Sequence, residues 1–537
     1  MVPFAAHRGH GRSAQLGDPA SLPGREGDRG RKVHGQDSQP CRLFRLCTRR
    51  SQGYRHGFGY FRAGRLRGMR KRPQGIRESL LGRPLRKNED EVGMMNNRII
   101  EAVGKVSGSV SAKVADWRLV ETRISRQEHY FVRSRRELAR SVRERTYALT
   151  LYVDSEAEGK KFRGDATVNI QPSYKDTEIE EKIRQGIFAA STSKNPWFDL
   201  PGPAEPKVSL PGSGFDAHGE PSMMESAKTA LYAPEAGAGG ARINSLELFI
   251  SNAEKNFINS KGHEFKAGGW KGYSEFVVET DSSQGPVELF DDIEFSDIEK
   301  KRLGEATGSR LGQVIDRATA LPLPSLGNIP VILSGKEAEK VFAWFFGNAG
   351  TDTIFTKASP FTLGMNVQER EKGGGVVDPL DIWAEPVLAG LPASAAFDED
   401  GFPLERTAVI EGGRLTCLVG PIRYADWLGQ PRKGAFSLFS VSPGSMSLKD
   451  MRALPCLEPV AFSDFRLNAV TGDFGAEIRL AYWFDGQKRV PVTGGSISGS
   501  VAEIRSTMRR SSERALAARS LCPRAILIDG LSVTGIA

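Results

Sequence analysis

One string in this sequence could begin a metal-binding motif. His263-Glu264 matches the start of a zincin helix, in which two histidines hold zinc and a glutamate polarises the attacking water. The next five residues, 265–269, end in two glycines that oppose a helix, and they supply no second histidine for the same helical face. We therefore expect His263 to be a surface histidine just after a turn and not a metal ligand.

The other potential metal ligands and nucleophiles are scattered. A catalytic zinc site needs about three protein ligands, yet four of the seven histidines lie within residues 1–93, and His129, His218 and His263 are far apart. The five cysteines show no C-x-x-C spacing, so they predict neither a disulfide framework nor a zinc ribbon. Cys417 lies in a strand-like run, where we favour a small buried hydrophobe over a nucleophile.

Length and hydropathy predict a soluble protein of two or three domains. The chain has 537 residues, 39% of them apolar, and it contains no apolar run of the roughly 18 residues that a transmembrane helix needs. Arg49-Arg50 is not followed by the hydrophobic stretch of an export signal. We expect a cytoplasmic protein.

The positive charge is concentrated at the N-terminus. Residues 1–93 contain 21 Lys and Arg against 8 Asp and Glu, whereas the rest of the chain contains 53 against 57. Three interpretations of residues 1–93 stay open: a disordered basic leader, an upstream translation preceding a true start at Met94 or Met95, and an arm that binds nucleic acid. The remaining chain is mildly acidic, which argues against nucleic-acid binding by the folded part.

The first half of the chain predicts hairpins and helices. Alternating apolar residues predict a half-buried strand at 147–153 and a return strand at 162–170. A capping box at Thr177-x-x-Glu180 begins an amphipathic helix with Ile179, Ile183 and Ile187 on one face. Residues 192–240 are rich in Pro, Gly, Ala and Ser and predict an irregular excursion.

A second hairpin and a helix complete that half. Strands are expected at 246–250 and 273–280, joined through the turn 259–262, and a helix is expected near 297–320. Two prolines in Leu321–Pro324 indicate a domain boundary.

The second half predicts a β-rich domain. A strand at 329–333 precedes a helix at 336–348, and short strands follow at 406–410, 415–419, 479–484, 490–492 and 525–528. We therefore predict an α+β protein with a basic segment at 1–93, a mixed α/β domain of hairpins and helices at 94–320, and a mainly-β, barrel-like domain at 325–537.

An ordered set of short motifs in the second half resembles the TldD/PmbA family of two-subunit metalloproteases, and the likeness extends over roughly 125–537. The motifs are Val331-Ile-Leu333, Asp378-Pro-Leu380, Phe397 to Pro403, Ile410 to Leu415, Tyr424 to Gly429, Val470-Thr-Gly-Asp-Phe474, Val490-Pro-Val492 and Ile497-Ser-Gly499. The resemblance, closest to the PmbA (TldE) branch, implies the two-domain α+β fold predicted above.

The resemblance also implies that the zinc ligands are missing here. Active subunits carry H-E-x-x-x-H, and the family's spacing places the two histidines at Ala343 and Asn348 and the glutamate at Trp344. The third ligand, a late cysteine, would lie between about 468 and 492, where this sequence has none. The implied function is a non-catalytic subunit with no catalytic residues or metal of its own, whose TldD-like partner binds zinc and cleaves small or unfolded peptides.

Two alternatives from other classes stay open. The family's older description as modulators of DNA gyrase implies a gyrase- or nucleic-acid-associated protein, and a third possibility is a non-proteolytic homodimeric scaffold.

Two further features have competing interpretations. Thr471, Gly472 and Asp473 form either a turn at a strand end or a loop that contacts the peptide groove or the partner subunit. The arginines at 133, 135, 136, 140, 143 and 145 are expected to form a solvated face or ion pairs, with a clamp for substrate carboxylates as the alternative.

Overall fold

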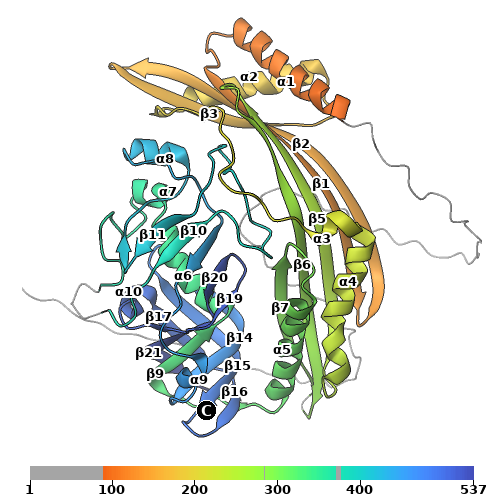
Figure 1. Ribbon diagram of the computed structural model, residues 1–537, viewed down its shortest axis with the longest axis vertical. Coiled ribbons are helices and arrows are strands. Elements are labelled where there is room, and N and C mark those ends of the chain that lie inside the picture. The colour runs from red at the N-terminus through yellow and green to blue at the C-terminus, as the bar shows by residue number, and fades with distance from the viewer. Residues whose placement is uncertain (1–88, 284, 370–375, 537) are drawn as a thin grey trace, which may run out of the picture. The chain divides into compact units, whose positions relative to one another are not determined.

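The computed structural model describes residues 89–283, 285–369 and 376–536 (Figure 1). The predictions made for residues 1–88 lie outside this part of the chain. The described residues form an α+β structure, as predicted, with a helix-covered antiparallel sheet followed by a β-rich region. Among them, no helix is long and apolar enough to cross a membrane.

The N-terminal half is built on one antiparallel sheet of seven strands in the order β4-β3-β2-β1-β5-β6-β7. These strands are β1 (Asp116–Val132), β2 (Arg135–Ala157), β3 (Lys160–Ile170), β4 (Asn195–Pro196), β5 (Arg242–Asn259), β6 (Glu264–Ser282) and β7 (Gly285–Phe295). The two predicted hairpins are confirmed as β2–β3 and β5–β6.

Two separate groups of helices cover one face of this sheet (Figure 1). α1 (Glu89–Ser109) and α2 (Asp176–Thr192) pack over the end that carries Leu119 and Leu149. α4 (Glu220–Tyr232) and α5 (Lys300–Ala318) pack over the end that carries Phe131 and Phe276.

Two predictions in this half are wrong. Residues 214–237 are not irregular, because they form α3 (Gly214–His218), α4 and the 3₁₀ helix η1 (Ala233–Gly237). Pro221 lies in the first turn of α4, where proline begins a helix instead of breaking it. The predicted capping box at Thr177 is also misplaced: α2 begins at Asp176, and the Glu178 carboxylate accepts a hydrogen bond from the Lys175 N–H at 2.8 Å.

The C-terminal half contains the predicted barrel-like element. β9 (Gly327–Ser334), β14 (Cys456–Leu467), β15 (Asp473–Phe484), β17 (Ser496–Ser500) and β21 (Ala525–Thr534) form a closed ring, because β14 pairs with both β9 and β15. β16 (Arg489–Thr493), β18 (Arg509–Arg510) and β8 (Leu321–Pro322) extend it. Because β8 pairs with β16, the first two residues of the predicted linker belong to this sheet; the domain division itself stays a prediction.

A second sheet lies beside this ring in the C-terminal half. Its order is β12-β11-β10-β13-β20-β19, from β10 (Ile382–Glu385), β11 (Thr407–Glu411), β12 (Arg414–Leu415), β13 (Leu438–Val441), β19 (Arg514–Leu516) and β20 (Ser520–Pro523). The strand predicted at 415–419 is therefore only two residues long, at 414–415. Short helices α7 (Thr351–Phe355), α8 (Ile422–Trp427), α9 (Leu448–Met451) and α10 (Val501–Ile504) connect the strands.

Helix α6 (Lys336–Asn348) has the bounds that the sequence predicted. Its apolar residues Ala338, Val341, Phe342 and Phe345 are completely buried in the main C-terminal core. This burial fixes the rotation of the helix, and so determines which of its other side chains face the loop at 468–473.

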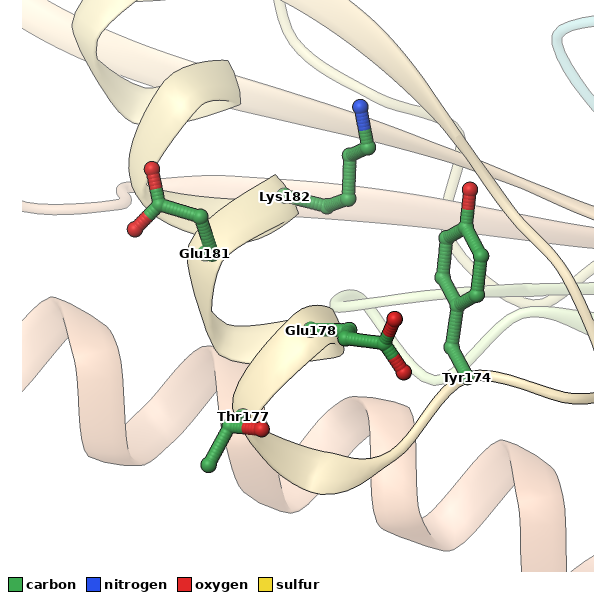
Figure 2. Close-up of a pocket in the computed structure, with 5 residues that line it drawn as sticks. All are labelled: Tyr174, Thr177, Glu178, Glu181 and Lys182. Atoms are coloured by element: carbon green, nitrogen blue, oxygen red, sulfur yellow. The ribbon is translucent and has the colours of Figure 1, made fainter.

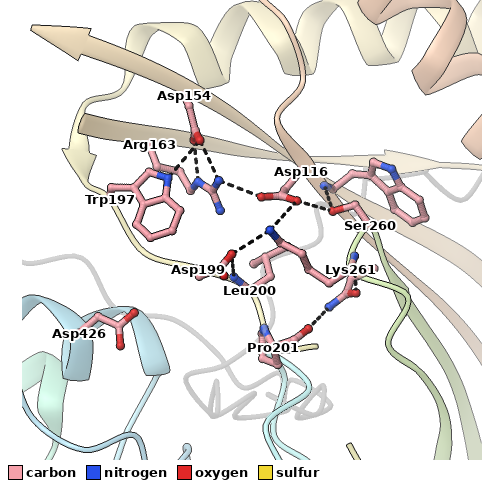
Figure 3. A network of polar contacts seen from close by, with 12 residues as sticks. Asp116, Asp154, Arg163, Trp197, Asp199, Leu200, Pro201, Ser260, Lys261 and Asp426 are labelled. Carbon is pink, nitrogen blue, oxygen red and sulfur yellow. Dashed lines mark hydrogen bonds and ion pairs between the residues drawn. The ribbon is translucent and has the colours of Figure 1, made fainter. Parts of the chain in front are cut away.

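A polar network links strands β1, β2 and β3 of the N-terminal sheet to residues 197–201 (Figure 3). Arg163 on β3, only 2% exposed, forms ion pairs with Asp154 at 2.7 Å and Asp116 at 2.8 Å. Lys261 pairs with Asp199 at 3.0 Å. On the C-terminal side, Arg423 of α8 pairs with Asp165 of β3 at 3.2 Å, so charged pairs hold α8 against the sheet.

Candidate functional site

The three positions that the family resemblance matches to a zinc-binding helix lie on α6, and none of them presents an imidazole, thiolate or carboxylate. Ala343 is exposed and has no donor atom, while Trp344 and Asn348 are buried. The amide nitrogen of Asn348 donates to the Trp344 carbonyl at 2.9 Å and to the Ala469 carbonyl at 3.1 Å. The Asn348 side chain thus fastens α6 to the loop 468–473.

The Trp344 indole fills the place that the sequence comparison assigns to the catalytic base. It is 3% exposed and packs edge-to-face against Phe345 and Phe361, each with ring centroids 5.2 Å apart. Its Nε1 is buried without a hydrogen-bond partner. An indole has no lone pair for a metal and no basic atom for a water, so this residue performs neither role.

The loop 468–473 is closed by its own hydrogen bonds and rests on this indole. The Asn468 side-chain oxygen accepts from the N–H groups of Val470 and Thr471, and the Asn468 N–H donates to the Asp473 carbonyl at 2.8 Å. Gly472 has φ +79°, and a Cβ there would lie 3.1 Å from Cε2 of Trp344. Glycine is therefore required by both backbone and packing.

Of the three loop residues singled out from the sequence, one is buried and two are exposed. Gly472 is buried against Trp344, whereas Thr471 and Asp473 are exposed and their side chains bond to each other at 2.7 Å. Val470 beside them is 52% exposed. Contact of this loop with a peptide or a partner subunit stays a prediction.

A zinc ion does not fit these residues. Zinc needs imidazole, thiolate or carboxylate ligands, and this part of α6 offers a methyl group, an indole and an amide already committed to two carbonyls. Within 89–283, 285–369 and 376–536, no three His, Cys, Asp or Glu side chains are grouped so that they could hold a metal ion.

The expectation that His263 is a surface residue is wrong. It is 1% exposed and lies among the rings of Phe257, Phe265 and Phe397. Its Nδ1 accepts from the Ala204 N–H at 3.3 Å, so its Nε2 carries the proton and donates to the Gly401 carbonyl at 2.9 Å. Burial lowers the pKa of His263, and with both nitrogens engaged the neutral ring is not a metal ligand.

The Phe397–Pro403 motif of the C-terminal half contacts His263 of the N-terminal half through Phe397 and Gly401. Asp398 Oδ1 accepts from the N–H groups of Asp400 and Phe402, which closes the turn. Burial, and then the neighbouring Asp400 carboxylate, raises the pKa of Asp398 to about 6. Arg118 of β1 pairs with Asp400 at 2.7 Å, so the motif braces the N-terminal sheet.

The two other candidates from the sequence are Cys417 and the cluster of arginines between residues 133 and 145. Cys417 is only partly buried, and desolvation raises the pKa of its thiol, which disfavours a reactive thiolate. Four of the clustered arginines form ion pairs, with partners Glu279 for Arg133, Glu137 for Arg135, Glu128 for Arg140 and Glu121 for Arg145.

A pocket of about 290 Å³ on α2 is a poor candidate for a catalytic site (Figure 2). Its lining residues are Tyr174, Thr177, Glu178, Glu181 and Lys182. Glu178 is used to cap α2, and all five residues come from this helix and the turn before it, whereas ligand pockets are mostly apolar clefts.

The fold defines a class: a two-part α+β protein whose β-rich half contains a metallopeptidase-type domain. The family profile of the PmbA/TldA metallopeptidase C-terminal domain matches residues 326–535. The C-terminal half of the chain therefore contains a domain of the PmbA/TldA metallopeptidase type. No protein of curated function matches it in sequence.

Three crystal structures share the fold. TldE from Thermococcus kodakarensis is 14% identical, with a TM-score of 0.65 over 82% of this chain and all of its own. A proposed modulator of DNA gyrase from Thermotoga maritima is 13% identical, with the same TM-score and coverage. Another from Bacteroides thetaiotaomicron is 16% identical, with a TM-score of 0.65 over 84% of this chain and all of its own.

Proposed function

We propose that this chain is the PmbA/TldE-like, non-catalytic subunit of a heterodimeric zinc metallopeptidase that acts on small or unfolded peptides in the cytoplasm. A TldD-like partner would hold the zinc, and this chain would help to enclose the peptide groove. The family of the C-terminal domain supports the metallopeptidase part of this proposal.

The non-catalytic assignment rests on Ala343, Trp344 and Asn348 of α6, the positions that the resemblance matches to the zinc-binding residues. Trp344 stands where a water-polarising base is needed, and its ring packs under Gly472 at near-contact distance. Restoring a base there would require the buried indole to be replaced by a carboxylate, which is costly to bury without a partner. The position is therefore built into the core of the domain.

Metal analysis of the purified chain tests this assignment. We expect sub-stoichiometric zinc after dialysis and no peptidase activity from the chain alone. About one tightly held zinc per chain, together with peptide hydrolysis that a chelator abolishes, would overturn it.

The exposed side of the loop 468–473 is our candidate for contact with the peptide or the partner. Thr471→Ala and Asp473→Asn should raise the KM of the mixed enzyme while leaving the Tm of this chain almost unchanged, because both side chains are exposed. An unchanged KM in both variants would remove the loop from the proposal.

A second candidate function follows from the description of two similar structures as proposed modulators of DNA gyrase. The excess of acidic residues beyond residue 93 disfavours direct DNA contact. Salt-sensitive DNA binding by a chain that begins at Met94 would support this candidate, and binding only by the full chain would assign it to residues 1–93.

A further inference from the structure

One half of strand β2 forms an open edge of the N-terminal sheet. β2 pairs with β1 along almost its whole length, but with β3 only from Tyr147 to Ala157. In the part of the chain that the structure describes, residues 135–146 therefore have a neighbouring strand on one side only. We call residues 135–146 the β2 edge; all of its side chains are exposed except those of Val142 and Arg145, which are half-buried.

The main-chain groups that point outward can be assigned. The Ser260 N–H donates to the Trp117 carbonyl, so odd-numbered residues of β1 bond to β5 and even-numbered ones bond to β2. On β2, the residues opposite those even positions are also even. Ala139, Ser141, Arg143 and Arg145 therefore direct their N–H and C=O groups away from the sheet.

The opposite edge of the same sheet is closed. On β7 the outward carbonyls of Glu288, Asp292 and Glu294 accept hydrogen bonds from cationic side chains of the following helices. These donors are Arg317, Lys336 and Arg302, in that order. No side chain of the described residues makes a comparable bond to the main chain of the β2 edge, so the two edges of the sheet differ in kind.

The β2 edge carries a net positive charge, because residues 135–146 contain five arginines and two glutamates. Neither Arg136 nor Arg143 forms an ion pair within the described residues, in contrast to the four paired arginines nearby. Arg145 shares the Glu121 carboxylate with Arg123, and the Nη2 atom of each is buried without a partner. Leu138 adds apolar surface, because it is 52% exposed.

We propose that the β2 edge binds an extended acidic polypeptide segment, which adds to the sheet as a further strand. Its main chain would bond to Ser141 and its neighbours, and its carboxylates would pair with Arg136 and Arg143. This inference is independent of the proposed peptidase function, because it concerns a different surface and is measured as binding.

Charge complementarity selects this occupant over the alternatives. Residues 135–146 contain five arginines and two glutamates, so the edges of two copies would bring net positive charge together, which is unfavourable. The N-terminal residues 1–93 are themselves strongly basic. A nucleic acid could pair with the arginines but could not continue the main-chain ladder, so open main-chain groups favour a polypeptide.

The test uses the full chain and two labelled nine-residue probes, one alternating Glu with Val and the other alternating Lys with Val. Fluorescence anisotropy should show saturable, salt-sensitive binding of the Glu probe and none of the Lys probe. Hydrogen exchange should slow at residues 139–145 when the Glu probe is bound. No binding, equal binding of both probes, or protection confined to another region would overturn the proposal.

Matched variants separate the main-chain and charge contributions. Ser141→Pro removes an outward N–H that has no partner among the described residues and should weaken binding about tenfold, whereas Ser141→Ala keeps that N–H and should bind normally. Arg143→Glu should weaken binding roughly tenfold, whereas Lys449→Glu, the same charge change at an exposed residue of α9, should not.

Thermal unfolding of each variant establishes that it is folded. If Ser141→Pro does not fold, Arg143→Glu still decides the test. Loss of affinity that Lys449→Glu reproduces would show a general charge effect and overturn the proposal. Self-association abolished by Arg143→Glu, or tighter binding of a DNA oligonucleotide than of the Glu probe, would assign the edge to another occupant and overturn it as well.

Discussion

Gly472→Ala tests whether the loop 468–473 is packed onto the indole that fills the helix site. The backbone at Gly472 has φ +79°, a conformation that costs an L-residue about 1–2 kcal/mol. The new Cβ would also lie 3.1 Å from Cε2 of Trp344 and 3.2 Å from Cβ of Val501, and such overpacking costs about 1–3 kcal/mol. We expect the free energy of unfolding to fall by about 3 kcal/mol, which lowers Tm by roughly 6–12 °C.

Two comparisons separate these contributions in a calorimetric unfolding experiment. Gly530→Ala has a similar backbone, φ +77°, with open space around the new Cβ, so it should show the backbone cost alone. Trp344→Phe, introduced into Gly472→Ala, removes the contacting Cε2 and should recover part of the packing cost. Equal losses for Gly472→Ala and Gly530→Ala, with no recovery by Trp344→Phe, would refute the packing described for this loop.

Three further changes have definite expected outcomes. Arg163→Met removes the nearer cation of buried Asp116, which keeps only Lys261 at 3.6 Å, and should lower the free energy of unfolding by about 3 kcal/mol, measured by urea denaturation. Burial lowers the pKa of His263 in the folded state, so the stabilising contribution of the neutral ring is complete above a pH of about 6.5 and is lost as pH falls. The Tm difference between wild type and His263→Gln should therefore narrow from about pH 7.5 to about pH 5.5. A difference that stays constant over this range would contradict the prediction. Ala343→His with Asn348→His should bind zinc weakly and stay inactive, as metal analysis and a peptidase assay would show, because no base or third ligand is restored.

The strands and helices that could be predicted were those with a clear local period. Helix α6 was located to the residue, since Ala338, Val341 and Phe342 repeat at helical spacing and are all buried. Helix α4 was missed although Met223, Ala227 and Leu231 carry the same period. Its flanking Pro and Gly residues give the segment a composition typical of loops, which obscures this period.

The surroundings of His263 could not be predicted, because they are made by distant residues. Phe397 and Gly401, more than 130 positions away in the sequence, close over the ring. The Phe397–Pro403 motif itself reads locally as a turn, and its turn geometry is confirmed by the bonds to Asp398. Its role in bracing β1 depends on tertiary contacts that leave no local pattern.

The substituted helix site shows the same division. The absence of ligands at Ala343 and Asn348 was visible in the sequence, whereas the reason Asn348 suits its position was not. Its amide bonds to the Ala469 carbonyl, 121 residues further along the chain. Only the fold shows that the site is occupied by packing and hydrogen bonds of the chain itself.

Reconstitution with a TldD-like partner tests the central claim most directly. The purified chain and the partner should be separated by size-exclusion chromatography singly and as a mixture, with peptide hydrolysis assayed in every fraction. We expect a mixed dimer, and we expect hydrolysis to coincide with it and to be absent from this chain alone. Hydrolysis in the partner's own fractions that is unchanged by adding this chain, or zinc-dependent hydrolysis by this chain alone, would contradict the account.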